Sequence, residues 1–320
     1  MRSYRRIARV LEEGMFDLMF FDDRLAMPTI HGDSPADAVR YGARPVKLDL
    51  STVLGAVAGA TEHIGLGATY STTCFQPFHV ARTFATLDHL SGGRAAWNIV
   101  TSVNDAEAQN FGLEEHLEHD KRYDRAEEFV EVVSKLWDSW EDDAVVADRS
   151  AGVFADPDKV HEVAHRGEYF SVRGPLTVPR TPQGRPVIIQ AGQSGRGRVF
   201  AARWADLIFT SDPSQEIARE RYREQRELIA EAGRAADSAR LLPMVYTIAG
   251  ETEAIAREKE RSCSTNSCIP WRRWPCSPRS PTTTSPATRS TTSSPTSCST
   301  RCPGSAGWSR GYGDTWATAN

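Results

Sequence analysis

Long apolar runs, a secretory signal and cysteine are all scarce in the first 260 residues of this 320-residue chain. No stretch approaches the roughly 20 apolar residues of a membrane-spanning helix. The N-terminal MRSYRRIARVLEEG is basic but lacks an apolar core, so no signal peptide is visible and a cytoplasmic location is expected. Cys74, the one cysteine of this region, is expected to be a buried small residue. The formal charge of −4 argues against nucleic acid or an acidic membrane as partner.

The last 60 residues differ in composition from the rest. Residues 261–320 contain five of the six cysteines, seven arginines, one aspartate and no lysine, and Ser, Thr and Pro dominate them. The cysteine spacings match neither a zinc site nor a disulfide framework that we recognise. A disulfide module, a mucin-like linker and an out-of-frame translation of a GC-rich gene are the three interpretations. Out-of-frame translation explains the abrupt change in composition, and it predicts that 259–320 is a low-complexity, disordered tail.

Short apolar segments alternate with helical patterns through the first 258 residues. The alternation predicts an α/β fold with a parallel sheet. Expected strands cover 16–23, 63–70, 94–102, 187–192, 206–211 and 241–250. Expected helices cover 5–15, 48–60, 77–90, 118–140, 196–205 and 213–235, and 141–186 is expected to be rich in loops.

Six strands fit a doubly wound open sheet as well as a (β/α)8 barrel that lacks two strands. The positions of polar residues favour the barrel, because its carboxyl strand ends converge on one mouth where sites are built. An open sheet would gather functional groups mainly at one switch point. The polar residues at predicted strand ends are Asp23, Thr69, Ser71, Asn98, Thr101 and Gln190.

The segment VIIQAGQSGRG (187–197) is a candidate phosphate site. A β-branched run ends in a glycine-rich loop that opens a helix, so backbone N–H groups and the Ser194 hydroxyl lie at a helix N-terminus. The loop is neither a Walker loop nor G-x-G-x-x-G, and a turn without a ligand is the alternative.

The remaining candidates are single residues and pairs. Asp23 is a carboxylate at the end of an apolar strand, where it is either solvated or functional. His119 and Tyr123 are four residues apart and share a helix face. Taken alone, this pair favours a solvated surface, and a ligand contact is the alternative. The histidines show no ligand spacing that fits a metal. No nucleophile elbow or acid/base pair is visible, so a cofactor is expected to carry the chemistry.

Five segments together resemble the flavin-dependent monooxygenases of the bacterial luciferase-like superfamily, in the nitrilotriacetate/dibenzothiophene-sulfone monooxygenase (component A) branch. They are FDLMFFDDRLA, GLGATYSTT, LDHLSGGRAAWNIVTS, HDKRYDRAEEF and VIIQAGQSGRGRVFAARWAD. The resemblance covers residues 1–258 and implies a (β/α)8 TIM barrel, here without its first and last strands. Asp22 and Ala96 depart from the family pattern, which usually has Ala and Gly there.

The resemblance also implies a cofactor, a partner and a reaction. Reduced FMN, supplied by a separate NADH:FMN oxidoreductase, would react with O2 to a C4a-hydroperoxide that oxygenates a sulfone, an aminopolycarboxylate or an alkane-like substrate. The intact protein would be a homo-oligomer. The residues expected to bind the flavin are Asp23, Thr69 and Asn98 near the ring, His119 and Tyr123 beside it, and Ser194 and Gly195 at the phosphate. The alternatives are a truncated, non-catalytic remnant that binds flavin weakly or not at all, and a deazaflavin-dependent oxidoreductase on the same barrel.

Overall fold

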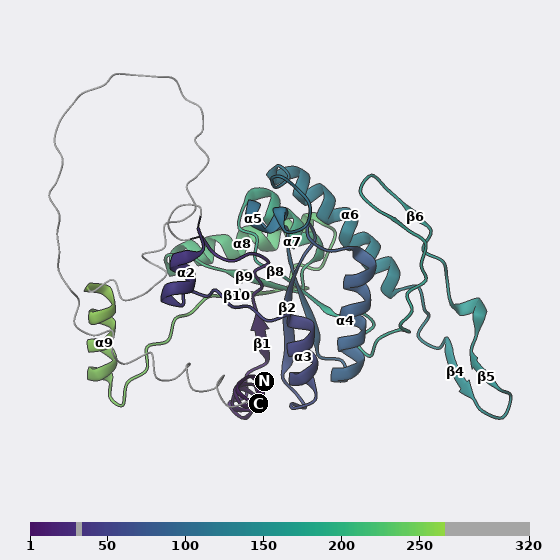
Figure 1. Ribbon diagram of the computed structural model, residues 1–320, viewed down its shortest axis with the longest axis horizontal. Coiled ribbons are helices and arrows are strands. Elements are labelled where there is room, and N and C mark those ends of the chain that lie inside the picture. Colours follow the sequence, from purple (N-terminus) through teal and green to yellow (C-terminus); the bar gives the residue numbers. More distant parts are fainter. Residues whose placement is uncertain (30–33, 266–320) are drawn as a thin grey trace, which may run out of the picture. The chain divides into compact units, whose positions relative to one another are not determined.

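A computed structural model describes residues 1–29 and 34–265 of the chain. Within them, six strands form one parallel sheet in the order β1-β2-β3-β8-β9-β10 (Figure 1). The strands are β1 (Leu18–Phe21), β2 (Gly65–Ser71), β3 (Ala95–Val100), β8 (Val187–Gln190), β9 (Leu207–Thr210) and β10 (Arg240–Pro243). Each of the six expected strands is present, but β10 ends at Pro243, so most of the expected strand 241–250 is not a strand. The tail prediction concerns residues that lie mostly outside the described ranges.

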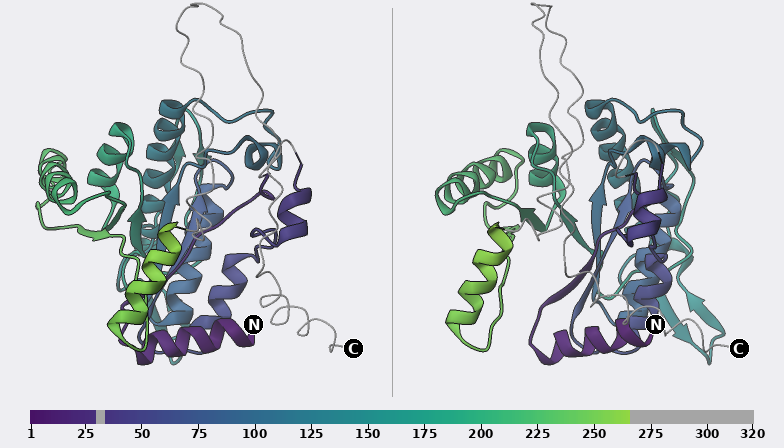
Figure 2. Two further views of the ribbon diagram at one scale, coloured as in Figure 1. Left: turned by 90° about the vertical axis from the view of Figure 1, so that its left-hand side faces the viewer. Right: turned by 60° about the vertical axis from the view of Figure 1, so that its left-hand side comes forward.

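The helices before and between the strands are also those expected, and two further short helices are present. They are α1 (Arg2–Glu13), α3 (Leu50–Ala58), α4 (Pro77–Ser91), α6 (His119–Trp137), α7 (Gly195–Trp204) and α8 (Gln215–Glu231). The additions are α2 (Ala36–Tyr41) and α5 (Asp105–Gln109), and α9 (Glu253–Thr265) follows β10. Each of α3, α4, α6, α7 and α8 packs on the next, so they form one continuous layer, which Figure 2 shows from two sides.

The sheet is strongly curled, and the curl distinguishes the barrel from an open sheet. Phe20 of β1 and Phe209 of β9 are separated by three strands, yet their ring centroids are 4.9 Å apart. In a flat sheet, four strand spacings would separate them by roughly 19 Å. The two side chains therefore meet across the concave face, and a single helical layer covers the convex face. This is the arrangement of a barrel wall, as the sequence predicted.

Gly67 lies at a crowded point of the concave face. A Cβ atom there would lie 3.2 Å from Cδ1 of Ile189 and 3.4 Å from the Phe20 ring. Ile189 and Phe20 come from strands on either side of β2. A side chain at position 67 would consequently require these two side chains to shift by a few tenths of an ångström.

The core lies between the convex face of the sheet and the helical layer. Trp97 of β3 is fully buried, and its ring contacts those of Phe84, Phe129 and Trp137 from α4 and α6. The apolar stripe of α6, expected from its helical spacing, is buried as well. Fully burying each such side chain contributes about 1.5–3 kcal/mol, which fixes α4 and α6 to the sheet.

The amino ends of the strands are tied together by two charged side chains. The guanidinium of Arg94, just before β3, donates to the carbonyls of Ala58, Thr61 and Ile64 at 2.8–3.2 Å. The Glu12 carboxylate of α1 accepts from the backbone N–H groups of residues 62, 63 and 64. Hydrogen bonds to charged groups are among the stronger ones, so these contacts lock α1 and α3 to the start of β2.

The stretch 141–186 was expected to be rich in loops, and within it the structure also has two small antiparallel strand pairs. β4 (Val145–Asp148) pairs with β5 (Val153–Ala155), and β6 (His165–Arg166) pairs with β7 (Ser171–Val172). The Glu128 carboxylate of α6 holds the second pair by accepting from His165 Nε2 and from the N–H groups of Tyr169 and Phe170, at 2.8–3.0 Å.

Candidate functional site

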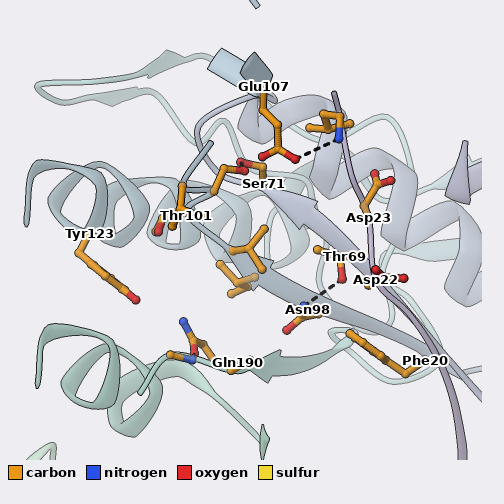
Figure 3. A pocket seen from close by; sticks show the side chains of 17 residues that line it. Phe20, Asp22, Asp23, Thr69, Ser71, Asn98, Thr101, Glu107, Tyr123 and Gln190 are labelled. Atoms are coloured by element: carbon orange, nitrogen blue, oxygen red, sulfur yellow. Dashed lines mark hydrogen bonds between the residues drawn. The ribbon is translucent and has the colours of Figure 1, made fainter. Parts of the chain in front are cut away.

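A pocket of about 380 Å³ opens at the carboxyl ends of β1, β2, β3 and β8 (Figure 3). The short strand β1 contributes Phe20, and the two carboxylates that follow it lie along the rim. Strands β2 and β3 contribute the floor through Thr69 and Asn98. Helices α5 and α6 add one side chain each, Glu107 and Tyr123. The pocket therefore lies where the barrel prediction located a site.

Four of the seven predicted flavin-binding residues line this pocket: Asp23, Thr69, Asn98 and Tyr123. The other three, His119, Ser194 and Gly195, do not line it. His119 lies one turn from Tyr123, with ring centroids 5.1 Å apart. Ser194 and Gly195 open α7, directly after the loop residues Ala191 and Gly192 that line the pocket. Four of the seven residues thus line the pocket, and the other three are next to lining residues in contact or in sequence.

A relay of hydrogen bonds fixes the orientation of Asn98. The Thr69 hydroxyl donates to the Phe21 carbonyl at 2.9 Å, so its oxygen can only accept from Asn98. The Asn98 amide nitrogen donates to it at 2.9 Å, and the amide oxygen Oδ1 points into the pocket (Figure 3). Asn98 is only 3% exposed, and its Oδ1 has no hydrogen-bond partner. A buried acceptor of this kind costs about 1–3 kcal/mol unless a ligand donates to it.

Tyr123 and the glycine-rich loop are packed too closely for side chains. A Cβ atom on Gly192 would lie 2.9 Å from the Tyr123 hydroxyl oxygen, and one on Gly197 would lie 2.6 Å from it. The Gln190 side chain accepts from the N–H of Gly192 and so ties the loop to β8. Tyr123 therefore links the pocket to the loop that precedes α7.

The first turn of α7 is built to accept an anion. Ser194 caps the helix by accepting from the N–H of Gly197 at 3.1 Å, and a Cβ at Gly195 would meet nothing within 4 Å. Free N–H groups at the start of a helix and its dipole favour negative charge there. Arg196 and Arg198 are paired with acidic side chains of α6 and α8, so the backbone rather than these arginines offers the donors.

The two carboxylates after β1 have opposite electrostatic environments. Burial raises the pKa of Asp22, but hydrogen bonds from Lys47, at 2.8 Å, and from Arg44 outweigh it and hold that pKa below its ordinary value. Burial raises the pKa of Asp23, and the N–H of Arg24, 2.8 Å away, offsets only part of the rise.

Glu107 is a lining residue that sequence reasoning missed. It lies in the five-residue α5, which is too short to show an apolar period, and its Oε1 accepts from the N–H of Leu25 at 3.1 Å. The capping residue Asn104, whose side chain accepts from the N–H of Ala106, is the one local signal for this helix. The neighbouring Asn110 donates to the Leu25 carbonyl at 2.8 Å. Both backbone groups of Leu25 are thereby fixed against the pocket rim.

Within 1–29 and 34–265, no group of three or more His, Cys, Asp and Glu side chains could hold a metal ion. In the same ranges, no helix has the length and apolar character needed to cross a membrane.

The residues present fit a flavin mononucleotide in two places. The unpaired Asn98 oxygen offers an acceptor to a polar ring, and the open first turn of α7 suits a phosphate. A curled parallel sheet with a pocket at its carboxyl strand ends is the arrangement of a (β/α)8-type barrel protein, a class in which active sites lie at that face. The luciferase-like monooxygenase family model matches residues 1–274, and the chain belongs to that family.

Named relatives agree with this membership. The chain is 53% identical over 259 residues to dibenzothiophene-sulfone monooxygenase of Rhodococcus erythropolis, covering 81% of this chain and 57% of that protein. It is 44% identical to nitrilotriacetate monooxygenase component A of Aminobacter aminovorans, covering 82% and 58%. A crystal structure of riboflavin lyase with modified FMN and riboflavin superposes with a TM-score of 0.77 at 37% identity, covering 81% and 58%. The chain thus spans less than two thirds of the length of these relatives.

Proposed function

We propose that the chain acts as the flavin-binding portion of an FMNH2-dependent, two-component monooxygenase that oxygenates a small organic substrate with O2. The observation that carries the proposal is the unpaired Asn98 oxygen in a pocket continuous with the glycine-rich start of α7. Family membership supports the monooxygenase class. The name "component A" of one relative supports a separate NADH:FMN oxidoreductase as the source of reduced flavin.

Reduced FMN would supply the two electrons that activate O2, so that one oxygen atom is transferred to the substrate and the other leaves as water. The protein's residues bind and orient it. Ser194 and Gly195 with the first N–H groups of α7 would hold the phosphate, while Asp23, Thr69 and Asn98 would contact the ring. His119 and Tyr123 would pack beside the flavin, and Tyr123 would also keep the phosphate loop aligned with the ring pocket.

The apolar lining residues have a separate task. Phe20, Leu25 and Val103 line the pocket beside its polar floor. An apolar approach excludes water from the reacting centre and strengthens the polar contacts within it. The protein thereby protects a reactive flavin from unproductive reaction with solvent.

Two alternatives remain distinct from this proposal. A deazaflavin-dependent oxidoreductase on the same barrel would transfer hydride without consuming O2. A non-catalytic flavin-binding protein would bind FMN and turn nothing over. Oxygen uptake with reduced FMN and a substrate separates the proposed function from both. Dibenzothiophene sulfone is the first substrate to try, because the relative at 53% identity is named for it.

The test begins with flavin binding to the purified 320-residue chain. Anaerobic titration with reduced FMN should give saturable binding, and Asn98→Leu should weaken it roughly tenfold, since one buried hydrogen bond contributes about 0.5–1.5 kcal/mol. Glu227→Gln, on an exposed part of α8, is the matched control and should bind FMN as the unaltered chain does. Saturable binding followed by sulfone-dependent O2 uptake supports the proposal. Absence of FMN binding would refute it.

A further inference from the structure

The chain leaves β3 through a backbone conformation that serine rarely adopts. Ser102 follows β3, lines the pocket and has a φ of 55°. A Cβ atom disfavours this left-handed region, which glycine enters freely. Among the described residues, five that are not glycine have a positive φ, and Ser102 is the one of them that lines the pocket. Backbone strain at a pocket wall persists only where its surroundings hold it, and it points to a role in the site.

The turn at Ser102 determines how the chain lines the pocket after β3. Thr101, Ser102 and Val103 all line it. Asn104 then caps α5, the helix that contributes Glu107 to the same pocket. If Ser102 relaxed to a negative φ, the residues after it would leave β3 in another direction. The conformation of this one residue therefore sets the position of a continuous part of the pocket wall.

Three hydrogen bonds hold the end of β3 in place. The Thr73 hydroxyl donates to the Thr101 carbonyl at 2.8 Å, and the Ser102 hydroxyl donates to Ser71 Oγ at 2.9 Å. Arg122 of α6 donates from Nη1 to the Ser102 carbonyl at 2.8 Å. This last bond acts on the backbone of Ser102 itself, because a rotation of that peptide would carry its carbonyl away from the guanidinium.

Arg122 makes this contact from a costly position. The residue is 9% exposed, and its Nε is buried without a hydrogen-bond partner. Burial lowers the pKa of Arg122, which Tyr123 and Asp105 partly offset, but an arginine stays charged at any ordinary pH. A charged donor makes a stronger hydrogen bond than a neutral one. Arg122 does not line the pocket, so any effect on a ligand passes through Ser102.

We propose that Arg122 is a positioning residue: it holds Ser102 in the left-handed conformation and so sets the wall formed by residues 101–103 against the flavin ring. The inference rests on the proposed function, because it concerns the same pocket. Without the guanidinium, Ser102 would relax and FMN would bind more weakly, although no group that contacts the flavin has been removed. A glycine at position 102 would adopt the same conformation without strain and make Arg122 largely dispensable.

The experiment combines Arg122→Met with Ser102→Gly in the full chain and measures the dissociation constant of reduced FMN anaerobically. Arg122→Met alone should weaken binding about tenfold. In the Ser102→Gly background, the same change should weaken binding less than about threefold. Ser102→Ala is the matched control, because it loses the same hydroxyl but keeps the Cβ. In that background, Arg122→Met should again weaken binding about tenfold. If Arg122→Met fails to fold, Arg122→Lys replaces it in the same three backgrounds.

A second control separates positioning from a loss of stability. Arg234 donates to the carbonyls of Ala202 and Ala205 at 3.0 and 2.8 Å, and it does not line the pocket. Arg234→Met should therefore lower the melting temperature but leave the FMN dissociation constant unchanged. The visible circular dichroism of bound oxidised FMN should also stay unchanged in Arg234→Met and should change in Arg122→Met, since only there do the surroundings of the ring shift.

The outcomes separate the two proposals. Equal losses of FMN affinity from Arg122→Met in the Ser102, Ser102→Gly and Ser102→Ala backgrounds would overturn the inference. An Arg122→Met protein that binds FMN as the unaltered chain does would overturn it too. Both results leave the proposed function standing, because the unaltered chain binds FMN in each. If the unaltered chain binds no FMN, the proposed function fails and the inference fails with it.

Discussion

The contact between Tyr123 and Gly197 makes a sharp prediction about the link between pocket and phosphate loop. In Gly197→Ala, the new Cβ would lie 2.6 Å from the Tyr123 hydroxyl oxygen, whereas real Cβ contacts essentially never fall below 3.0 Å. Tyr123 is only 6% exposed and is packed between His119 and Phe200, so it has little room to retreat. Either the tyrosine or the first turn of α7 must shift.

The cost follows from two opposing terms. Replacing glycine by alanine inside a helix gains up to about 1 kcal/mol, and overpacking typically costs about 1–3 kcal/mol. Gly197→Ala should therefore lower the free energy of unfolding by about 1–2 kcal/mol, or the melting temperature by roughly 3–6 °C. Reduced FMN should bind more weakly as well, because the displaced group joins the ring pocket to the phosphate site.

Circular dichroism melts and FMN titrations provide the assay, with two internal controls. Gly195→Ala, in the same helical turn, places its Cβ in open space and should melt at or slightly above the temperature of the unaltered chain. Tyr123→Phe removes the atom at 2.6 Å, so Gly197→Ala should be far less damaging in that background. The steric reasoning would be refuted if Gly197→Ala lowered the melting temperature equally in the unaltered chain and in Tyr123→Phe. Equal melting temperatures of Gly195→Ala and Gly197→Ala would refute it as well.

Three further predictions concern titration. Asp23 is half-buried and its pKa is raised, so ionising it costs stability as the pH rises above 3.8. Asp23→Asn should therefore raise the melting temperature at pH 7, with the gain shrinking toward pH 4, and no gain would contradict this. Burial raises the pKa of Glu128, but the hydrogen bonds from His165, Tyr169 and Phe170 outweigh burial, and the net pKa is lowered. The ionised carboxylate therefore contributes stability above pH 4.5, and this stability is lost as the pH falls. In urea unfolding, Glu128→Gln should cost about 2 kcal/mol at pH 7 and less near pH 4. Burial raises the pKa of Tyr70 to about 12. In an absorbance titration, the tyrosine ionisation at the highest pH should therefore be absent from Tyr70→Phe. Because the folded protein resists this ionisation, its stability should decline once the pH exceeds 10.

The sheet could be predicted from the sequence because its signals are local. Each strand is a short apolar run, and the polar residue at its end is adjacent in the chain, as with Thr69 and Asn98. The curl could not be derived in this way, because it depends on Phe20 meeting Phe209, nearly 190 residues later. The number of strands left an open sheet equally possible; the polar residues at the strand ends favoured the barrel, and the resemblance to a family implied it as well.

The candidate site was predicted in part for the same reason. Asp23, Thr69, Asn98 and Tyr123 were proposed and do line one pocket. Glu107 was missed, because a five-residue helix has no period to detect and its role arises from a bond to Leu25, 82 residues away. The direction of the Asn98 amide depends on the Thr69 bond to Phe21, and no linear pattern encodes it. Their roles toward FMN stay predictions until the titrations above are made.

The ties at the amino ends of the strands have a consequence for how such a protein can change over time. Arg94 and Glu12 hold α1, α3 and the start of β2 through backbone groups, at the opposite end of the strands from the pocket. Rim residues such as Leu25 and Val103 are not involved in those contacts. The rim is thus free to accumulate substitutions that alter what enters the pocket, while the anchors that keep the sheet folded are untouched. Because the anchoring contacts and the pocket rim involve different residues, substitutions at the rim can change which substrate enters while the anchoring contacts stay intact.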